Sequence, residues 1–161
     1  MKVTIRPVDY NNKQDGEYLI SLLNGYAQDP MGGAEPLSDF SQKNLVNALA
    51  KLPHAFSVIA FVDEKPAGLI NCFEGFSTFA CKPVVNIHDV TVDENYRGLG
   101  LSQKMLDEVE RIAREKGACK LTLEVLEGNT VARNSYLKYG FKGYELDPKM
   151  GKAEFWEKKL K

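Results

Sequence analysis

One stretch, residues 84–125, constrains the fold of this chain more than any other. It runs from the apolar segment VVNIHDVTV through a polar turn with Gly98 and Gly100 into SQKMLDEVERIAREK, and then into a second apolar segment, CKLTLEV. Short apolar runs bounded by turn residues indicate strands, whereas apolar residues every three or four positions indicate a helix. The order strand, turn, helix, strand predicts two parallel strands joined by a right-handed crossover, and therefore an α/β domain.

The turn at residues 97–102 has the composition of an anion-binding site. Gly98 and Gly100 let the backbone take positive φ values, so that successive N–H groups can point outward together. A helix that begins near Ser102 adds unpaired N–H groups and the positive end of its dipole. Arg97 adds a full positive charge. For an isolated G-x-G the alternative is a plain connection whose glycines serve only the backbone conformation.

Two phosphate-binding motifs do not fit this turn. A P-loop requires a lysine after its second glycine, but Leu101 and Ser102 follow Gly100. A dinucleotide fingerprint requires a third glycine, but Gln103 stands at that position.

Two blocks of sequence resemble motifs of the GCN5-related N-acetyltransferase (GNAT) superfamily. In VNIHDVTVDENYRGLGLSQKML, Arg97 and Gly100 match the acetyl-CoA motif [QR]-x-x-G-x-[GA], and Ser102 stands where the family usually has Gly or Ala. The downstream block EGNTVARNSYLKYGF resembles the element N-x-x-A-x-x-x-Y-x-x-x-G-F, through Asn129, Ala132, Tyr136, Gly140 and Phe141. The aromatic-rich stretch FSTFACKPV before the first block is faintly similar to the polyamine acetyltransferase branch.

The resemblance implies one GNAT domain over residues 1–161, with an α/β fold. Strands are expected at residues 2–8, 56–62, 67–73, 84–92, 119–125, 141–146 and 153–160, and helices at 15–27, 39–51, 102–116 and 130–140. This order gives a mixed central sheet of about seven strands flanked by about four helices. Asp39 and Gln42 are spaced as a capping box at the start of the second helix.

The resemblance also implies where acetyl-CoA binds as the acyl donor. In the family the two parallel strands splay at their carboxyl ends, the edge of the earlier strand pairs with the pantetheine arm, and the glycine turn holds the pyrophosphate. The residues so implied are Val90, Thr91, Val92, Arg97, Gly98, Leu99, Gly100, Leu101, Ser102, Asn129 and Arg133. For Arg133 a solvated helix charge is the alternative.

The implied reaction is attack by a primary amine on the thioester carbonyl. An ammonium ion has no lone pair, so a base must remove a proton, and an acid assists departure of the thiolate. Tyr136, in register with the second motif, is the candidate acid. His88 is the candidate base because the ordinary pKa of histidine suits proton abstraction at neutral pH. Asp89 is expected to face the opposite side of the strand, and Asp89, Glu124 and a water chain stay open as alternative bases.

The acceptor is expected to be the amine of a small molecule. A protein N-terminus or lysine, an aminoglycoside and an amino acid stay open, and four carboxylates are candidates for binding a cationic amine: Asp29, Glu35, Asp89 and Glu124. Two rival functions keep the same donor site. One is a non-catalytic acyl-CoA-binding sensor module, and the other is acyl transfer to a hydroxyl or a thiol.

Composition bounds the remaining possibilities. A net charge of −1 gives no electrostatic reason to expect nucleic acid as a partner. The chain has neither a run of about 18 apolar residues nor an apolar leader, which predicts no membrane span. Its three cysteines lack a C-x-x-C pair, so no disulfide framework and no metal site are expected, and the cytoplasm is the expected location. A homodimer through the closing hairpin would use Phe155 and Trp156, which are equally consistent with core positions.

Overall fold

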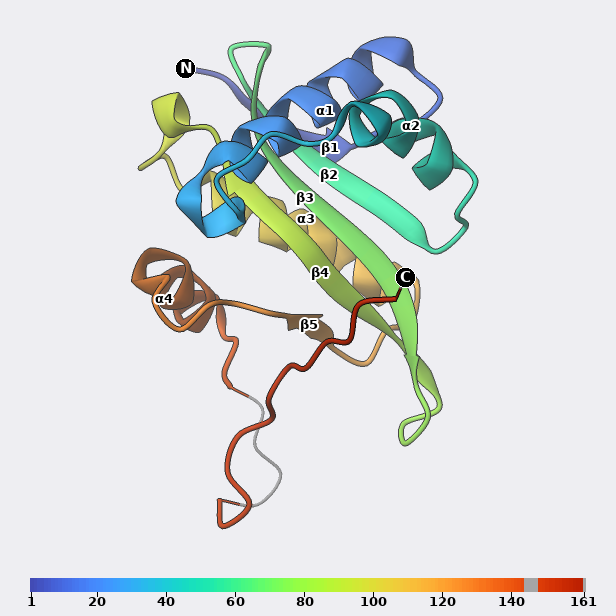
Figure 1. Cartoon of the computed structure of the whole chain (residues 1–161), viewed down its shortest axis with the longest axis vertical. Coiled ribbons are helices and arrows are strands. Elements are labelled where there is room, and N and C mark those ends of the chain that lie inside the picture. The colour runs from blue at the N-terminus through green and yellow to red at the C-terminus, as the bar shows by residue number, and fades with distance from the viewer. Residues whose placement is uncertain (144–147, 161) are drawn as a thin grey trace. The chain divides into compact units, whose positions relative to one another are not determined.

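The computed structural model describes residues 1–143 and 148–160, and it consists of two compact units, Met1–Leu126 and Glu127–Lys161. The larger unit contains, in order, β1 (Val3–Pro7), α1 (Lys13–Gln28), η1 (Pro30–Gly32), α2 (Asp39–Ala50), β2 (Ala55–Val62), β3 (Lys65–Ser77), β4 (Lys82–Val92), η2 (Glu94–Tyr96), α3 (Leu101–Glu115) and β5 (Leu121–Leu123) (Figure 1). The smaller unit contains α4 (Thr130–Tyr139).

A single mixed sheet with the order β1-β2-β3-β4-β5 forms the centre of the larger unit. Strands β1 to β4 pair antiparallel, and β4 and β5 pair parallel, as the strand–turn–helix–strand segment predicts. Within residues 1–143 and 148–160 the sheet has five strands, so the expectation of about seven is wrong.

The two missing strands are those of the closing hairpin. Residues 144–147 lie outside the described part of the chain, and residues 141–143 and 153–160 form no strand. The aromatic side chains that might anchor the second strand are exposed, Phe155 by 71% and Trp156 by 83%, so they are not core residues. The physical reason is that a strand needs one buried face, and Phe155 and Trp156 stand among charged residues with too few apolar neighbours to form one. A homodimer through this segment stays a prediction.

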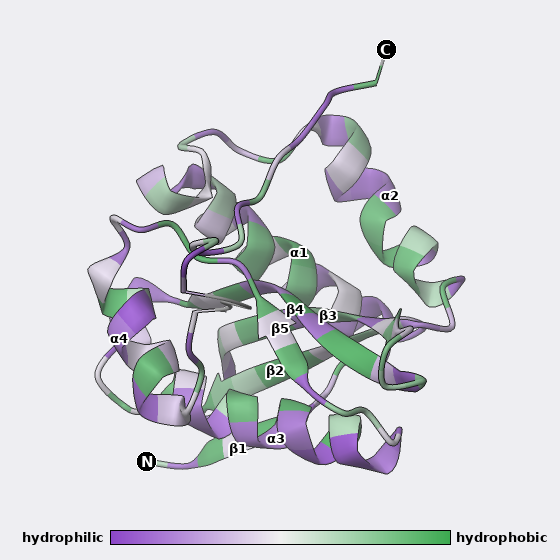
Figure 2. Ribbon diagram, turned by 90° about the horizontal axis from the view of Figure 1, so that it is seen from below, coloured by the Kyte–Doolittle hydropathy of each residue, from purple (hydrophilic) through white to green (hydrophobic). Residues whose placement is uncertain are grey.

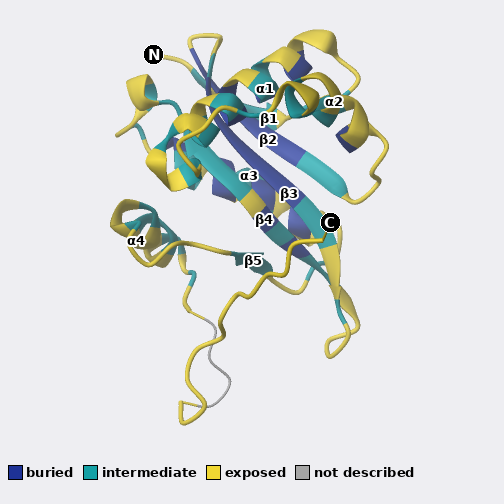
Figure 3. Ribbon diagram, viewed as in Figure 1, coloured by how far each residue is buried: buried dark blue, intermediate teal, exposed yellow. Residues whose placement is uncertain are grey.

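Helices cover both faces of the sheet. Helices α1 and α2 lie on one face and α3 on the other, and β2 and β3 run buried between them (Figures 1 and 3). On the first face, apolar side chains of α1 and α2 pack against those of β2 and β3 in one cluster, which consists of Leu19, Leu22, Leu23, Leu49, Ile59, Phe61 and Leu69. Burial of this cluster provides the main driving force for the layer.

Helix α3 packs on the opposite face through one apolar stripe (Figure 2). The buried members of the stripe are Leu101, Met105, Leu106, Val109 and Ala113. Helix and sheet approach closely at Gly68, where an added Cβ would lie 2.8 Å from the Met105 Cε. The outer face carries ion pairs such as Arg114 with Glu110 at 3.2 Å, which confirms the amphipathic pattern.

Polar contacts fix the starts of the first two helices. The Asn12 side chain accepts from the Asp15 N–H, and the buried Asp15 carboxylate accepts two hydrogen bonds of 2.7 Å from Arg6 on β1. Helix α2 is capped by Ser38, whose hydroxyl accepts from the Ser41 N–H at 3.1 Å. The predicted capping box beginning at Asp39 is therefore one residue late. Ser38 is the residue with extended backbone angles, as an N-cap requires, whereas Asp39 is already helical.

No helix among the described residues has the length and apolar character needed to cross a membrane.

Candidate active site

The turn between β4 and α3 has the conformation that its glycines predict. Gly98 and Gly100 have φ values of 81° and 74°, and Gly100 is the N-cap of α3 without any side-chain cap hydrogen bond. Leu101, 2% exposed, anchors the first turn of the helix in the core. Among the described residues, the N–H groups of Gly98, Leu99 and Gly100 donate to no protein acceptor. The turn is therefore a set of unused donors at a helix N-terminus, the arrangement that suits a phosphate.

Arg97 lies at the entrance to this turn. Its Nε–H donates to the Val92 carbonyl at 3.4 Å, and its guanidinium lies 3.9 Å from the Asp29 carboxylate. The Arg97 side chain is 62% exposed, so these contacts are weak and leave its charge accessible to a ligand. Asp29 follows α1 and caps η1 by accepting from the Met31 N–H, so the loop between α1 and α2 lies beside the glycine turn.

The pairing between β4 and β5 ends before β4 does. They pair only at Val85, Asn86 and Ile87, whereas β4 continues to Val92. Asp93 directly follows β4, and its N–H donates to the Ala67 carbonyl on β3, so the backbone groups of Asp93 point to β3. The direction of the backbone groups alternates from one residue to the next along a strand. The N–H and C=O groups of Val90 and Val92 therefore point to the open edge, while those of Thr91 point to β3. Strand β5 ends at Leu123, where its pairing with β4 also ends, so among the described strands the carboxyl half of β4 has an edge that β5 leaves open, and this edge leads to the glycine turn. The splay of the two parallel strands stays a prediction.

A β-bulge places His88 and Asp89 on the same face of the sheet. Asn71 pairs with Asp89 and Cys72 with Ile87, so His88 is the extra residue. The Asn71 amide donates to the Asp89 carboxylate at 3.1 Å, and the His88 ring meets the Phe73 ring at 5.4 Å. Because Asn71 and Phe73 are two residues apart on β3, both contacts lie on one face, the one that α1 and α2 cover. The expectation that Asp89 faces away from His88 is wrong, since strict alternation fails at a bulge.

Two of the four candidate carboxylates, Asp29 and Asp89, affect the pKa of Tyr26 near the end of α1. Burial raises the pKa of the Tyr26 hydroxyl, and the negative charges of Asp89 and Asp29 raise it further. Glu35 and Glu124 are exposed, and neither forms an ion pair within the described residues. Glu124 also lies one residue beyond β5 rather than on it. The carboxylates of Asp29 and Asp89 thus both act on Tyr26, and Asp89 shares its sheet face with His88.

The second motif forms a capped helix in the smaller unit. Asn129 is the N-cap of α4 and accepts from the Ala132 N–H at 3.3 Å, and Gly140, with φ 118°, ends the helix. The Tyr136 ring packs edge-on against Phe141 with ring centroids 6.0 Å apart. Arg133 donates to the Glu127 carbonyl at 3.4 Å. The spacing of this motif thus has a local structural cause in caps and ring packing, and the proposed roles of Tyr136, Asn129 and Arg133 rest on the motif alone.

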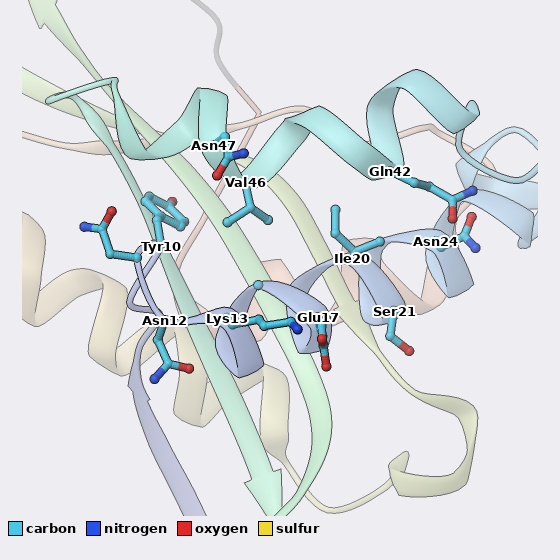
Figure 4. A pocket seen from close by; sticks show the side chains of 12 residues that line it. Tyr10, Asn12, Lys13, Glu17, Ile20, Ser21, Asn24, Gln42, Val46 and Asn47 are labelled. Atoms are coloured by element: carbon cyan, nitrogen blue, oxygen red, sulfur yellow. The ribbon is translucent and has the colours of Figure 1, made fainter.

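A groove of about 630 Å³ lies between α1 and α2 (Figure 4), away from the β4 edge and the glycine turn. None of the residues expected to bind acetyl-CoA lines it. Part of its polar lining already serves the fold, because Asn24 accepts from the Leu37 N–H and Gln42 donates to the Leu37 carbonyl. Its volume alone does not make it the reaction site.

Sequence reasoning missed three residues of this region, Tyr26 on α1, Ser57 on β2 and Asn71 on β3. Tyr26 stands out in the sequence only as one of several apolar positions on its helix. Ser57 and Asn71 are single polar residues inside the apolar runs FSVIAFV and AGLINCF, and both are buried. That interruption of an apolar run is the signal that could have found them.

Comparisons with known proteins agree with this geometry. Residues 19–141 match the acetyltransferase (GNAT) family. A thialysine N-epsilon-acetyltransferase of Caenorhabditis elegans is 25% identical over 121 residues, which cover 69% of this chain and 74% of that protein. The solved structure of a probable acetyltransferase superposes with a TM-score of 0.79 at 20% identity over 100% of both chains. The aminoglycoside N-acetyltransferase AAC(6')-Iy, in complex with the bisubstrate analog CoA-S-monomethyl-acetylneamine, superposes with a TM-score of 0.76 at 20% identity, covering 99% of this chain and 100% of that chain.

The structural likenesses establish the fold, and the family match extends over both motifs and over strands β2 to β5. Together with the glycine turn between β4 and α3, these findings show that the chain belongs to the GNAT family of acetyltransferases.

Proposed function

We propose that the protein transfers an acetyl group from acetyl-CoA to a primary amine of a small molecule, by direct attack in a ternary complex. The observation that carries the proposal is the continuity of the open β4 edge with the glycine turn in the larger unit. An extended arm with amide groups fits the edge at Val90 and Val92, and a pyrophosphate fits the donors of residues 98–101. The N–H groups of Gly98, Leu99 and Gly100, which donate to no acceptor among the described residues, support this placement.

Each residue has a distinct part in this proposal. Arg97 contributes charge to the pyrophosphate, and the Val90 and Val92 backbone groups orient the thioester arm. His88, at the bulge, accepts the proton of the ammonium ion. The amine nitrogen then forms its bond to the carbonyl carbon as the carbon–sulfur bond breaks, and the thiolate takes a proton from Tyr136. The nitrogen loses its second proton as the amide forms, and this proton restores the Tyr136 hydroxyl. The role of Tyr136, like those of Asn129 and Arg133, is proposed from the motif in which it stands.

The expectation of a small acceptor has support from proteins similar to this one. The names of two relatives, the thialysine N-epsilon-acetyltransferase and the aminoglycoside N-acetyltransferase, refer to small amines. In this chain the carboxylates of Asp29 and Asp89 both act on Tyr26, and Asp89 adjoins the candidate base His88, so these charges would favour a cationic acceptor. A cytoplasmic location and a single catalytic domain over residues 1–161 complete the proposal.

The test is thiol release from acetyl-CoA, followed spectrophotometrically with the purified protein and pooled acceptors. The pools are polyamines, amino acids, aminoglycosides and lysine peptides, and calorimetry measures acetyl-CoA binding in parallel. Release that depends on a small-amine pool is the expected result. Release with lysine peptides alone would instead indicate a protein N-acetyltransferase. Binding without release in any pool would favour the non-catalytic sensor, and absence of binding would overturn the assignment of the glycine turn.

A further inference from the structure

A row of polar side chains crosses three strands on the face that α1 and α2 cover. Ser57 on β2 lies opposite Asn71 on β3, and Asn71 lies opposite Asp89 on β4. Ser57 is 1% exposed and Asn71 4% exposed. The next row on the same face contains Ile59 and Leu69, both fully buried. Since buried polar groups are unfavourable unless they are hydrogen-bonded, such a row in an apolar sheet needs a reason.

Each hydrogen bond along the row is donated toward Asp89. The Ser57 hydroxyl donates to Asn71 Oδ1 at 2.6 Å, and Asn71 Nδ2 donates to Asp89 Oδ2 at 3.1 Å. Because the Ser57 proton is used in this way, the Tyr10 hydroxyl, 2.7 Å from Ser57 Oγ, must be the donor of that bond. A reversed Asn71 amide would set its oxygen against the Asp89 carboxylate, and two acceptors cannot bond. Tyr10 and Ser57 therefore hold the Asn71 N–H group aimed at Asp89.

Asp89 at the end of this row is suited to receive a cation. Its carboxylate is half-buried, and among the described residues it forms no ion pair with lysine, arginine or histidine. The bulge places it on the same face as His88, and its charge acts on Tyr26 together with that of Asp29. Because its donor is the neutral Asn71 amide, no positively charged side chain among the described residues competes with a ligand cation for this carboxylate.

We propose that Asn71, fixed by Ser57 and Tyr10, is a positioning residue that holds the Asp89 carboxylate as the docking point for an ammonium group of the acceptor. This inference rests on the proposed function and deepens it, because it assigns the recognition of the acceptor to one carboxylate and to the side chains behind it. The amine that reacts gives its proton to His88, and Asp89 orients the acceptor without taking part in the bond changes.

The test compares Asn71→Leu, a near-isosteric change that removes the donor, with Asp89→Asn, which removes the charge. For the amine selected by the acceptor panel, Asn71→Leu should raise the acceptor KM by ~10-fold or more, since charge-assisted bonds lose that much when one partner is misplaced. The KM for acetyl-CoA and kcat should change by less than ~3-fold. An unchanged acceptor KM in Asn71→Leu would overturn the inference.

The double variant separates positioning from a general structural role. If Asn71 acts through Asp89, adding Asn71→Leu to Asp89→Asn should change the acceptor KM little further, whereas a purely structural defect would persist and add. Should Asn71→Leu fail to fold, Tyr10→Phe removes only the outermost donor and should raise the acceptor KM by ~2- to 3-fold.

Equilibrium binding provides a readout that does not depend on turnover. Calorimetry measures the affinity of the wild type and of Asn71→Leu for spermidine and for neamine. Weaker binding by Asn71→Leu than by the wild type supports the inference. Equal binding by both proteins overturns the inference but leaves the proposed function standing. Binding of neither amine by a wild type that binds acetyl-CoA would overturn the proposed class of acceptor, and the inference with it.

Discussion

Gly98 and Gly100 show what a single residue contributes to the donor site. Both have positive φ values, and a Cβ built on either one meets no atom within 4 Å. Backbone conformation, and not crowding within the protein, therefore requires glycine at these positions. Their N–H groups donate to no acceptor among the described residues.

Replacement of Gly100 by valine should weaken acetyl-CoA binding. A β-branched residue disfavours the left-handed conformation, so the turn would change shape, and we expect the affinity to fall by ~10-fold or more. Calorimetry with acetyl-CoA measures the effect. Gly25→Ala is the matched control, because Gly25 lies exposed within α1 with no atom near its added Cβ. This control should leave binding unaltered and stabilise the helix by ~0.5 to 1 kcal/mol; unaltered affinity in Gly100→Val would contradict the site.

Loss of the Tyr136 hydroxyl should slow turnover while leaving the donor affinity nearly intact. If Tyr136 protonates the departing thiolate, Tyr136→Phe should lower kcat by ~10²-fold. Tyr139→Phe is the control, since the Tyr139 ring also lies 6.0 Å from the Phe141 ring and shares its packing. Steady-state kinetics compares the two variants. Equal turnover in Tyr136→Phe and wild type would remove this tyrosine from the mechanism.

At the scale of elements, β4 serves two neighbours in turn. Its first half pairs with both β3 and β5, and after the bulge at His88 only β3, among the described strands, remains as its partner. The bulge also resets the alternation of backbone groups, so that Val90 and Val92 present their N–H and C=O groups to the open edge. One strand thus supports the sheet on one side and offers an unpaired edge on the other.

Proline substitutions can separate these two edges of β4. Val90→Pro removes an N–H on the open edge, so we expect acetyl-CoA affinity to fall by ~2- to 10-fold with little change in stability. Thr91→Pro removes an N–H bonded to β3, and it should reduce the free energy of unfolding by ~1 to 3 kcal/mol. Urea denaturation and calorimetry measure the two quantities. A loss of stability by Val90→Pro as large as that by Thr91→Pro would contradict the assignment of the edges.

At the scale of the whole molecule, the ion pair of Asp15 with Arg6 connects α1 to β1 and makes stability depend on pH. The Arg6 guanidinium and the Asp9 N–H hold the pKa of the buried Asp15 carboxyl below its ordinary value. The unfolded chain therefore binds this proton more readily than the folded one. The stabilisation is fully present above the ordinary carboxyl pKa of about 4 and is lost as the pH falls through the lowered pKa.

Asp15→Asn should reduce the free energy of unfolding by about 2 kcal/mol at pH 7, because Arg6 loses its charged partner. The difference from the wild type should shrink as the pH falls below about 4, where the Asp15 carboxyl itself takes up a proton. Urea denaturation over a series of pH values measures both effects. Glu17→Gln, an exposed change on the same helix, should have little effect at any pH. A difference that stays constant down to pH 2 would contradict the linkage.

The sequence by itself determined the features that arise from local physics. The apolar stripe of α3, the positive φ values of Gly98 and Gly100, and the end of α4 at Gly140 depend on residues within one or two turns of each other. Local periodicity and the conformational range of glycine are legible in the amino-acid order. The family resemblance agreed with the order of the elements and added the proposed position of the donor site.

Only the tertiary structure decided which side chains meet. The bulge that turns Asp89 to the face of His88 arises from pairing with β3, and the contacts of Asn71 with Ser57 and Asp89 join residues on three strands. The closing hairpin failed as a prediction for the same reason, since residues 153–160 would need a packing partner that their own sequence does not specify. Strand register and the convergence of polar groups depend on contacts between distant residues, and the free energy of such contacts is absent from any local pattern.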